Sequence, residues 1–318
     1  MWISPYKYVL SLGHLCSDIN QSILSAVLPF LIATYHYDYT TATMLVTVSN
    51  VFGAFVQPFI GMLSDKKNKL LYMTLGVLLA SGGMAVTGFI SNFFGLCIAV
   101  IMSGIGVAMF HPQAAKLINS VSSKNAKGKG MSIFSFGGKV GFTLGPVYTA
   151  FLMNLFGMKG TILFLIPGIV FGIVCSFFNK DFENLDVLEV EKKEKVKSEQ
   201  KDDWSGFIKL CGVVFSRSIL SNGISTFLAF YFIQQFSKSN SFASMLLSVF
   251  YGIGSITLLG GGIADCFGHR KMVRLSFCIF LPAIFIFTNT SHFVIALIML
   301  IFMTCGESLS YSPMVVLG

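Results

Sequence analysis

The chain has 318 residues, of which 54% are hydrophobic and only 11% are charged, and its mean hydropathy is +0.76. A soluble domain carries roughly 25% charged residues, so this composition excludes an ordinary water-soluble protein and predicts a chain whose main solvent is lipid. The formal net charge of +8 comes from lysines and arginines on separate loops, and we therefore expect no nucleic-acid partner.

Apolar stretches recur along the chain, each with about the 20 residues that a helix needs to cross a bilayer. They predict an all-α membrane protein with about ten transmembrane helices. We expect residues 1–180 to form an N-terminal bundle of six helices, 181–204 a charged cytoplasmic linker, and 205–318 a C-terminal bundle of four. The ten stretches are approximately 8–34, 41–63, 70–90, 93–118, 130–154, 160–178, 205–235, 243–264, 273–290 and 292–317.

Basic residues are concentrated in every second loop. Under the positive-inside rule these loops are cytoplasmic, and so is the N-terminus. The first residues lack the cleavage site of a secretory signal, so the first helix is expected to be retained. The sequence thus predicts a multi-pass protein of a bacterial-type inner membrane. The basic loops contain Lys66, Lys67 and Lys69, then Lys124, Lys127 and Lys129, then five lysines from Lys192 to Lys201, then Arg270, Lys271 and Arg274.

The two bundles repeat one another at an offset of 200 residues. The equivalent pairs are Leu28 and Leu228, Gly61 and Gly261, Asp65 and Asp265, and Gly106 and Gly306. Parallel repeats joined by a linker are a common way to build a transporter, with the substrate site between the halves near the middle of the membrane. An enzyme or a receptor has no need of such symmetry.

Several short motifs carry a family resemblance. "GMLSDKKNK" and "GGIADCFGHRK" look like the loop signature of the major facilitator superfamily, in which an aspartate follows a glycine by four residues and precedes a basic cluster. "GHLCSDINQS", "FHPQAAK", "SIFSFGGKVGFTLGP" and "SPMVVLG" resemble the fosmidomycin-resistance subgroup of efflux proteins. The resemblance implies a twelve-helix bundle of two pseudo-equivalent halves. Because the chain reaches about ten helices and stops inside an apolar run, we expect a longer product with two further helices.

Four charged residues lie near the middle of predicted helices, where each costs at least about 2.5–3.5 kcal/mol. They are Asp18, Lys139, Arg217 and Glu307. His14 precedes Asp18 by one turn, on the same face. Asp18, His111, Arg217 and Glu307 fall on the first, fourth, seventh and tenth predicted helices. The resemblance implies that these helices line the central cavity, so the four side chains are expected to face the transport path.

Each of these residues has a functional and a structural interpretation. We expect Asp18, tuned by His14, to carry the coupling proton, because a desolvated carboxyl group can exchange protons in the working pH range. The candidate substrate and cavity residues are His111, Gln113, Lys139, Arg217 and Glu307. The alternatives are that Asp18 and His14 only stabilise the first helix and that Arg217 and Glu307 form a structural ion pair. His111 could likewise serve only to fill a kink at the following proline, and Lys116 is expected to extend toward the cytoplasm.

Two departures from the subgroup's pattern bear on the substrate. The subgroup usually has glutamate at the position of Gln113 and asparagine at that of Lys139. If both residues face the cavity, the local charge moves by about two units toward binding anions. The pattern therefore favours an anionic, phosphonate-like drug or metabolite.

Small residues mark a packing segment and two loops. Spacing of four permits close helix contact, and the segment contains Gly137, Gly138, Gly141, Gly145 and Pro146. The resemblance implies that this segment packs between the halves and could act as a hinge. The resemblance also makes the two loops candidates for inner gates, although plain solvated loops remain the alternative. The candidate gate residues are Gly61, Asp65, Gly261, Asp265, Gly268, Arg270 and Lys271.

We therefore predict a proton-coupled secondary transporter that exports a small molecule by alternating access. Its expected partners are substrate, protons and lipid, and it is expected to be a monomer. Import or uniport of a small anion is the alternative within transport, and a membrane-embedded enzyme is the alternative outside it. No GxxxxGK phosphate loop is present, which disfavours ATP-driven pumping. In "HLCSD", Cys16 points away from His14 and Asp18 on a helix, so we predict no metal site and no cofactor.

Overall fold

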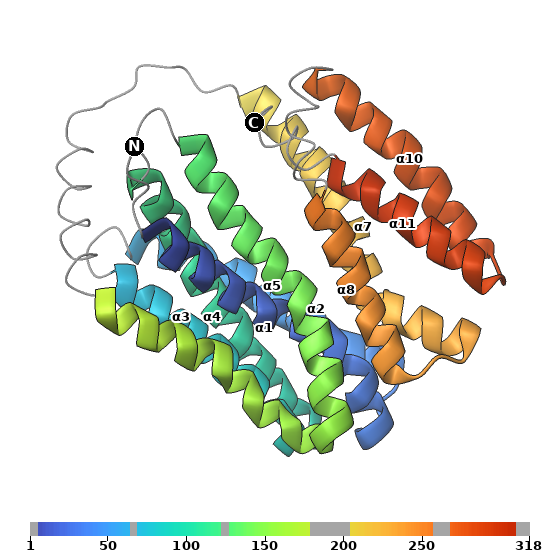
Figure 1. The fold of residues 1–318 in the computed structure, drawn as a ribbon, viewed down its shortest axis with the longest axis horizontal. Helices are drawn as coiled ribbons and strands as arrows, with labels where there is room; N and C mark the ends of the chain where they lie inside the picture. Colours follow the sequence, from blue (N-terminus) through green and yellow to red (C-terminus); the bar gives the residue numbers. More distant parts are fainter. Residues whose placement is uncertain (1–5, 64–68, 122–126, 179–203, 257–267, 310–318) are drawn as a thin grey trace. The chain divides into compact units, whose positions relative to one another are not determined.

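The computed structural model describes the chain except residues 1–5, 64–68, 122–126, 179–203, 257–267 and 310–318, and its described elements are helices (Figure 1). The predicted all-α membrane class is confirmed. The first helices are α1 (Tyr6–Tyr35), α2 (Tyr39–Leu63), α3 (Lys69–Val86), η1 (Thr87–Phe89), α4 (Phe93–Val121), α5 (Lys127–Phe156), η3 (Gly157–Phe164) and a helix over 165–178. They are followed by α7 (Trp204–Phe236), α8 (Asn240–Ile256), α10 (His269–Asn289) and α11 (Phe293–Leu309).

The chain separates into two compact units, Met1–Ser198 and Glu199–Gly318. Most of the predicted linker 181–204 lies outside the described residues. Within the described ranges, 7 helical spans are long and apolar enough to cross a membrane. One of them, Ile133–Phe178, combines two predicted stretches. These are 130–154, within α5, and 160–178, which begins as the 3-10 helix η3 after Gly157 ends α5 with a φ of 58°.

Two predicted stretches of the second unit are only partly described. The stretch 243–264 is helical through α8 as far as Ile256, and its remainder lies outside the described residues. The stretch 292–317 forms α11 as far as Leu309. The candidate gate residues Asp65, Gly261 and Asp265 also lie outside the described residues.

In the first unit, α1 is the most deeply placed helix, with 78% of its most apolar window buried. Its polar side chains are buried with it because α5 packs closely alongside. Three glycines of α5, each four residues after the last, lie against α1: Gly137 meets the carbonyl of Ser11, Gly141 that of Leu15, and Gly145 the hydroxyl of Ser22. An added Cβ at any of the three would collide with these atoms, so the small residues allow the close approach.

Glycines also bring α4 against its other neighbours. Gly106 of α4 lies against the backbone of α3 at Gly76 and Ala80, and Gly104 lies against Ser49 of α2. In the second unit the equivalent residue, Gly306 of α11, lies against the backbone of Phe280 of α10. The pairing of Gly106 with Gly306 that the sequence repeat predicts therefore corresponds to similar close contacts in the two units.

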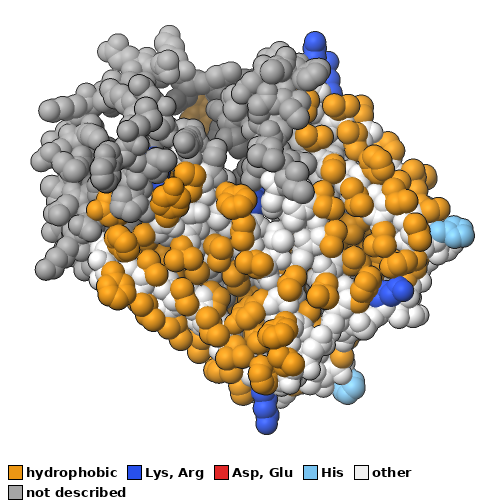
Figure 2. Space-filling view, viewed as in Figure 1, with side chains coloured by type: hydrophobic (Ala, Val, Ile, Leu, Met, Phe, Trp, Pro, Cys, Tyr) orange, Lys and Arg blue, Asp and Glu red, His pale blue; other side chains and the backbone are white. Residues whose placement is uncertain are grey.

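Large hydrophobic side chains cover much of the surface, as expected of a chain that spans a membrane. On the face shown in Figure 2 they predominate over the described helices, and the coloured Lys, Arg and His side chains lie mostly toward its margins. Phe55, Phe94, Phe177 and Phe285 are each more than two-thirds exposed, at 68%, 81%, 78% and 69%. Exposure of this many phenylalanines fits a lipid solvent, in which an apolar surface has no cost.

Candidate functional site

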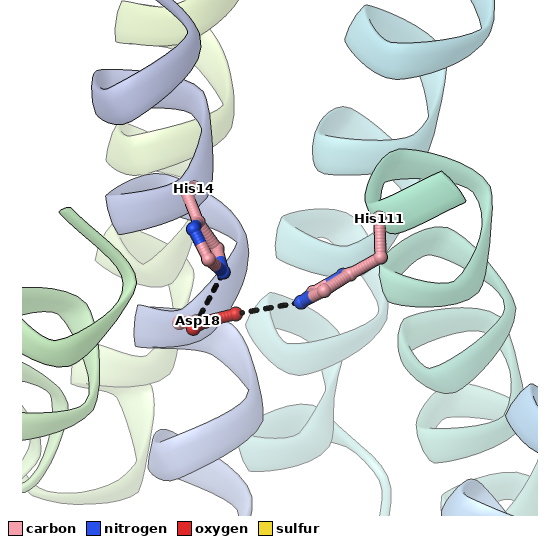
Figure 3. A group of neighbouring side chains, drawn as sticks. All are labelled: His14, Asp18 and His111. Carbon is pink, nitrogen blue, oxygen red and sulfur yellow. Dashed lines mark ion pairs between the residues drawn. The ribbon is translucent and has the colours of Figure 1, made fainter. Parts of the chain in front are cut away.

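Asp18 of α1 is held between two histidines in the first unit (Figure 3). Its Oδ2 lies 3.2 Å from Nε2 of His14, one turn earlier on the same helix. Its Oδ1 lies 3.2 Å from Nε2 of His111, which comes from α4. Asp18 itself is only 3% exposed. The structure thus joins the predicted proton residues on α1 to a residue that the sequence assigned to the substrate cavity, and we call these three residues the His–Asp–His cluster.

The other nitrogen of each imidazole is fixed by a backbone carbonyl. His14 Nδ1 lies 2.9 Å from the carbonyl oxygen of Phe134 on α5. His111 Nδ1 lies 3.0 Å from that of Val107, one turn earlier on α4. A carbonyl oxygen can only accept a hydrogen bond, so each Nδ1 carries its hydrogen and each Nε2 is the nitrogen presented to Asp18. The His14 ring also stacks on Phe134, with 4.1 Å between ring centroids.

The charge of the His–Asp–His cluster affects the contact between α1 and α4. Each Nε2 forms an ion pair with Asp18 only when the imidazole is protonated, and a neutral imidazole would instead turn a lone pair toward the carboxylate. A buried carboxylate that loses a partner is costly to keep charged. Changes in the charge of the cluster therefore change the attraction between α1 and α4.

Gly138 closes one side of the cluster. A Cβ at this position would lie 2.6 Å from both Asp18 Oδ2 and His14 Nε2. The sequence assigned Gly138 to helix packing, and the structure places it against the ionisable groups themselves. Lys139 follows on α5 and is half-buried.

Gln113 and Lys116 contact the end of α2 rather than the cluster. Gln113 Nε2 donates to the carbonyl of Ile60 at 3.3 Å, and Lys116 Nζ donates to that of Gly61 at 3.2 Å. These carbonyls belong to the last described turn of α2. Lys116, which is predicted to extend toward the cytoplasm, attaches α4 to α2 next to the candidate gate residue Gly61.

In the second unit, Arg217 of α7 and Glu307 of α11 form an ion pair through Arg217 Nη2 and Glu307 Oε1. Both side chains are mostly buried, with 14% and 9% exposed. They line a small pocket together with Ser276 and Phe280 of α10. The structure therefore brings together the two residues for which the sequence left a structural ion pair open.

The remaining candidate gate residues lie at the start of α10. Gly268 precedes this helix with a φ of 88°, and its carbonyl accepts the backbone N–H of Lys271 at 3.1 Å. The side chain of Arg270 lies outside the described part of the chain.

Sequence reasoning missed three features of the site. The carbonyl of Phe134 is a backbone group, so no side-chain motif could have indicated its role. Gly138 could have been singled out from the sequence, because it directly follows Gly137 and is not part of the four-residue spacing of the other glycines. The convergence of His111 with Asp18 likewise depends on how α4 packs on α1, which no local pattern encodes.

Two histidines and one aspartate that lie this close together can also bind a metal ion. The candidate ligand atoms of His14, Asp18 and His111 all lie within 4.8 Å of one another. Cys16 is not part of this group, since it is buried in the hydrophobic core with Leu10 and Phe171. On the first helix alone, the sequence offers His14 and Asp18 as possible metal ligands. His111 of α4 is the third possible ligand.

Comparison with known proteins places this site in a family context. The family model for the Major Facilitator Superfamily matches residues 10–318. The fosmidomycin resistance protein of Escherichia coli (strain K12) is 23% identical over 276 residues, which cover 83% of this chain and 66% of that protein. The MFS-type transporter YfnC of Bacillus subtilis (strain 168) is 24% identical over 278 residues, covering 85% of this chain and 68% of that protein. The chain thus spans about two-thirds of the length of these relatives.

Among solved structures, a bacterial homolog of the human lysosomal transporter Spinster, in an inward-facing and occupied conformation, has the same fold, with a TM-score of 0.80. The two sequences are 16% identical, and the match covers 98% of this chain and 73% of the other. The family match over nearly the whole sequence, the helical fold and the repeated halves agree, and the chain belongs to the Major Facilitator Superfamily.

Proposed function

We propose that this protein is a secondary transporter that exports a small drug or metabolite in exchange for protons, by alternating access in a bacterial inner membrane. Membership of the family supports transport, and the efflux proteins among its relatives support export. The N-terminus is proposed to face the cytoplasm, and the working unit is proposed to be a monomer. No enzymatic step is part of this proposal.

The observation that carries the proposal is Asp18, buried at 3% exposure between two imidazoles on helices long enough to cross a membrane. Ionisable groups inside a membrane are costly and usually mark substrate paths or proton relays. In our proposal the His–Asp–His cluster exchanges the coupling proton, with Asp18 and His14 as its centre. Uptake or release of that proton changes the ion pairs that join α1 to α4 and so favours one conformation over the other.

The proposed substrate is anionic, as a phosphonate drug is. Support comes from Lys139, which stands where the fosmidomycin-resistance subgroup usually has asparagine and lies half-buried on α5 beside Gly138. Gln113 gives weaker support, because its side chain is completely buried against α2. Arg217 is the second proposed anion contact, provided that its ion pair with Glu307 opens during transport.

The test is accumulation of fosmidomycin in inside-out membrane vesicles that contain the full-length protein. An imposed pH gradient, acidic inside, is expected to drive accumulation, and Asp18→Asn is expected to abolish it. His292→Ala, which removes an exposed histidine, is the matched control and should leave accumulation unchanged. Gradient-driven accumulation that survives Asp18→Asn would refute the proton assignment.

Direction is tested separately in whole cells. An exporter driven by protons leaves cells with less substrate, so an uncoupler is expected to raise the cellular content of labelled fosmidomycin. An importer would show the opposite effect of the uncoupler, and that result would replace export with uptake of a small anion.

A further inference from the structure

We propose that the His–Asp–His cluster is a binding site for a divalent first-row transition-metal ion such as Zn²⁺ or Co²⁺. The ligands are Nε2 of His14, the carboxylate of Asp18 and Nε2 of His111, which all lie within 4.8 Å of one another. The inference concerns binding alone and does not rest on the proposed transport.

The first support is the way in which both imidazoles are held. Each Nδ1 lies within 3.0 Å of a backbone carbonyl, that of Phe134 for His14 and that of Val107 for His111. Histidines that bind metals almost always donate their second ring N–H in this way, because the bond fixes the ring and leaves the other nitrogen free for the metal. Two histidines from different helices meet this condition and turn the same ring atom toward one carboxylate.

The second support is the burial of the carboxylate against two imidazole nitrogens. Asp18 is only 3% exposed, and each of its oxygens faces one Nε2 at 3.2 Å. When both imidazoles are neutral, with their hydrogens on Nδ1, they turn lone pairs toward a buried negative charge, which is costly without a compensating partner. A cation bound beside these three groups would supply that partner.

The spacing of the ligands fits a metal of this class. Zinc binds imidazole nitrogen and carboxylate oxygen at about 2.0–2.2 Å, which in a tetrahedron places neighbouring ligand atoms about 3.3–3.6 Å apart. Both observed Nε2–oxygen distances are 3.2 Å, close to that range, and each goes to a different oxygen of Asp18, so the carboxylate would bind the ion through both oxygens. Two nitrogen ligands to one oxygen ligand favour zinc, cobalt or similar ions over Mg²⁺ or Ca²⁺, which prefer oxygen.

The surroundings leave one side open for the ion. Gly138 lies close against Asp18 and His14, so α5 closes the cluster on that side without a side chain. The His111 side chain is 30% exposed, so the cluster is accessible from this side. Because the ligands come from α1 and α4, a bound ion would hold these two helices together.

The experiment uses the purified full chain in detergent, with Co²⁺ as the probe and its visible absorption as the readout. Four-coordinate Co²⁺ absorbs more strongly than the hydrated ion, so a titration reports both affinity and geometry, and added Zn²⁺ should abolish the signal. The test variants are His14→Ala, Asp18→Asn and His111→Ala. Loss of a partner outside the ligand set already weakens metal sites by 10-fold to 100-fold, so each variant is expected to bind at least about 100-fold more weakly.

Two matched controls address other metal ligands on the surface. His292→Ala removes an exposed histidine and Cys211→Ser an exposed thiol, and both should bind Co²⁺ like the wild type. The more conservative His111→Gln guards against misfolding, since it keeps a polar side chain but should lose the signal. In parallel, Zn²⁺ should raise the melting temperature of the wild type and not that of His111→Gln.

Equal Co²⁺ spectra and affinities in the wild type and all three ligand variants would overturn the inference, as would loss of the signal in the controls alone. Failure here is distinguishable from failure of the proposed transport. Binding is measured without substrate or gradient, so transport that depends on Asp18 can stand while the metal site falls, and the reverse also holds.

Discussion

His111 reaches across from α4 to Asp18 of α1, with 3.2 Å between its Nε2 and the carboxylate Oδ1. In the second unit, Arg217 of α7 and Glu307 of α11 make the corresponding connection between the first and the fourth predicted helix of that half. Among the described residues, each unit therefore has a buried ionic link between its first and its fourth predicted helix, although the residue types differ. The first link can change its charge through histidine, whereas arginine keeps its charge permanently.

The Asp18–His111 contact is expected to be energetically coupled. A double-mutant cycle with Asp18→Asn and His111→Gln should give a coupling free energy of about 1–3 kcal/mol, because the residues share one buried cluster. The measurement is the free energy of unfolding of the purified protein for the wild type, both single variants and the double variant. Strictly additive effects would show that the contact contributes nothing to stability.

Gly138→Ala is expected to destabilise the protein by about 1–3 kcal/mol, because the new methyl group would overlap Asp18 and His14. Gly82→Ala in α3 is the control, since a Cβ there has nothing within 4 Å. In a helix that substitution is neutral or stabilising by up to about 1 kcal/mol. Thermal unfolding of the two variants should therefore shift in opposite directions, or at least differ clearly, and equal shifts would contradict the assigned role of Gly138.

Removing either partner of the Arg217–Glu307 pair should cost about 3–5 kcal/mol, because it leaves an uncompensated buried charge. We expect this loss for Arg217→Met and for Glu307→Leu. The double variant should recover most of the stability, since two apolar side chains of similar size leave no charge unpaired. Stability is again measured by unfolding, and a double variant less stable than both single variants would argue against a simple ion pair.

Lys116→Ala is expected to loosen the last turn of α2, because it removes the cation that donates to the Gly61 carbonyl. Such contacts at a helix C-terminus contribute about 0.3–1 kcal/mol. Hydrogen exchange of the amides in that turn should become faster, with little change elsewhere. Lys159→Ala serves as the exposed control. Unchanged exchange at the end of α2 would mean that the Lys116 contact does not hold this turn.

Lys139→Asn, which restores the subgroup's usual residue, should weaken binding of an anionic substrate. Loss of one charge-assisted contact corresponds to about 1.5–3 kcal/mol, or roughly 10-fold to 100-fold in affinity. The measurement is the concentration dependence of fosmidomycin transport in the vesicle assay, with a neutral substrate, if one is found, as comparison. An affinity that does not change would remove Lys139 from the substrate site.

The helices and the family followed from the sequence because their signals are local. Apolar length defined the spans, and the aspartate and glycine motifs carried the resemblance to the superfamily. The glycine spacing around Gly141 indicated close packing, but not that the partner would be α1. The partner of a helix depends on complementary surfaces far apart in sequence, which a single sequence does not reveal.

The sequence predicted which residues belong to the candidate site better than it predicted how they are arranged. Asp18 and His14 share a helical face, which local spacing predicts. His111 was assigned to a cavity, and Gln113 with it, yet only His111 meets Asp18 whereas Gln113 bonds to the end of α2. Because Gln113 follows His111 by two residues, the two project in different directions around α4.

Close glycine contacts join α1 to α5, and they also join α4 to α2 and α3. His14 and Asp18 lie on α1, while His111 lies on α4. The His–Asp–His cluster therefore spans the boundary between α1 and α4. Any displacement of one of these helices along the other would change the distances within the cluster, so these distances would report such a movement.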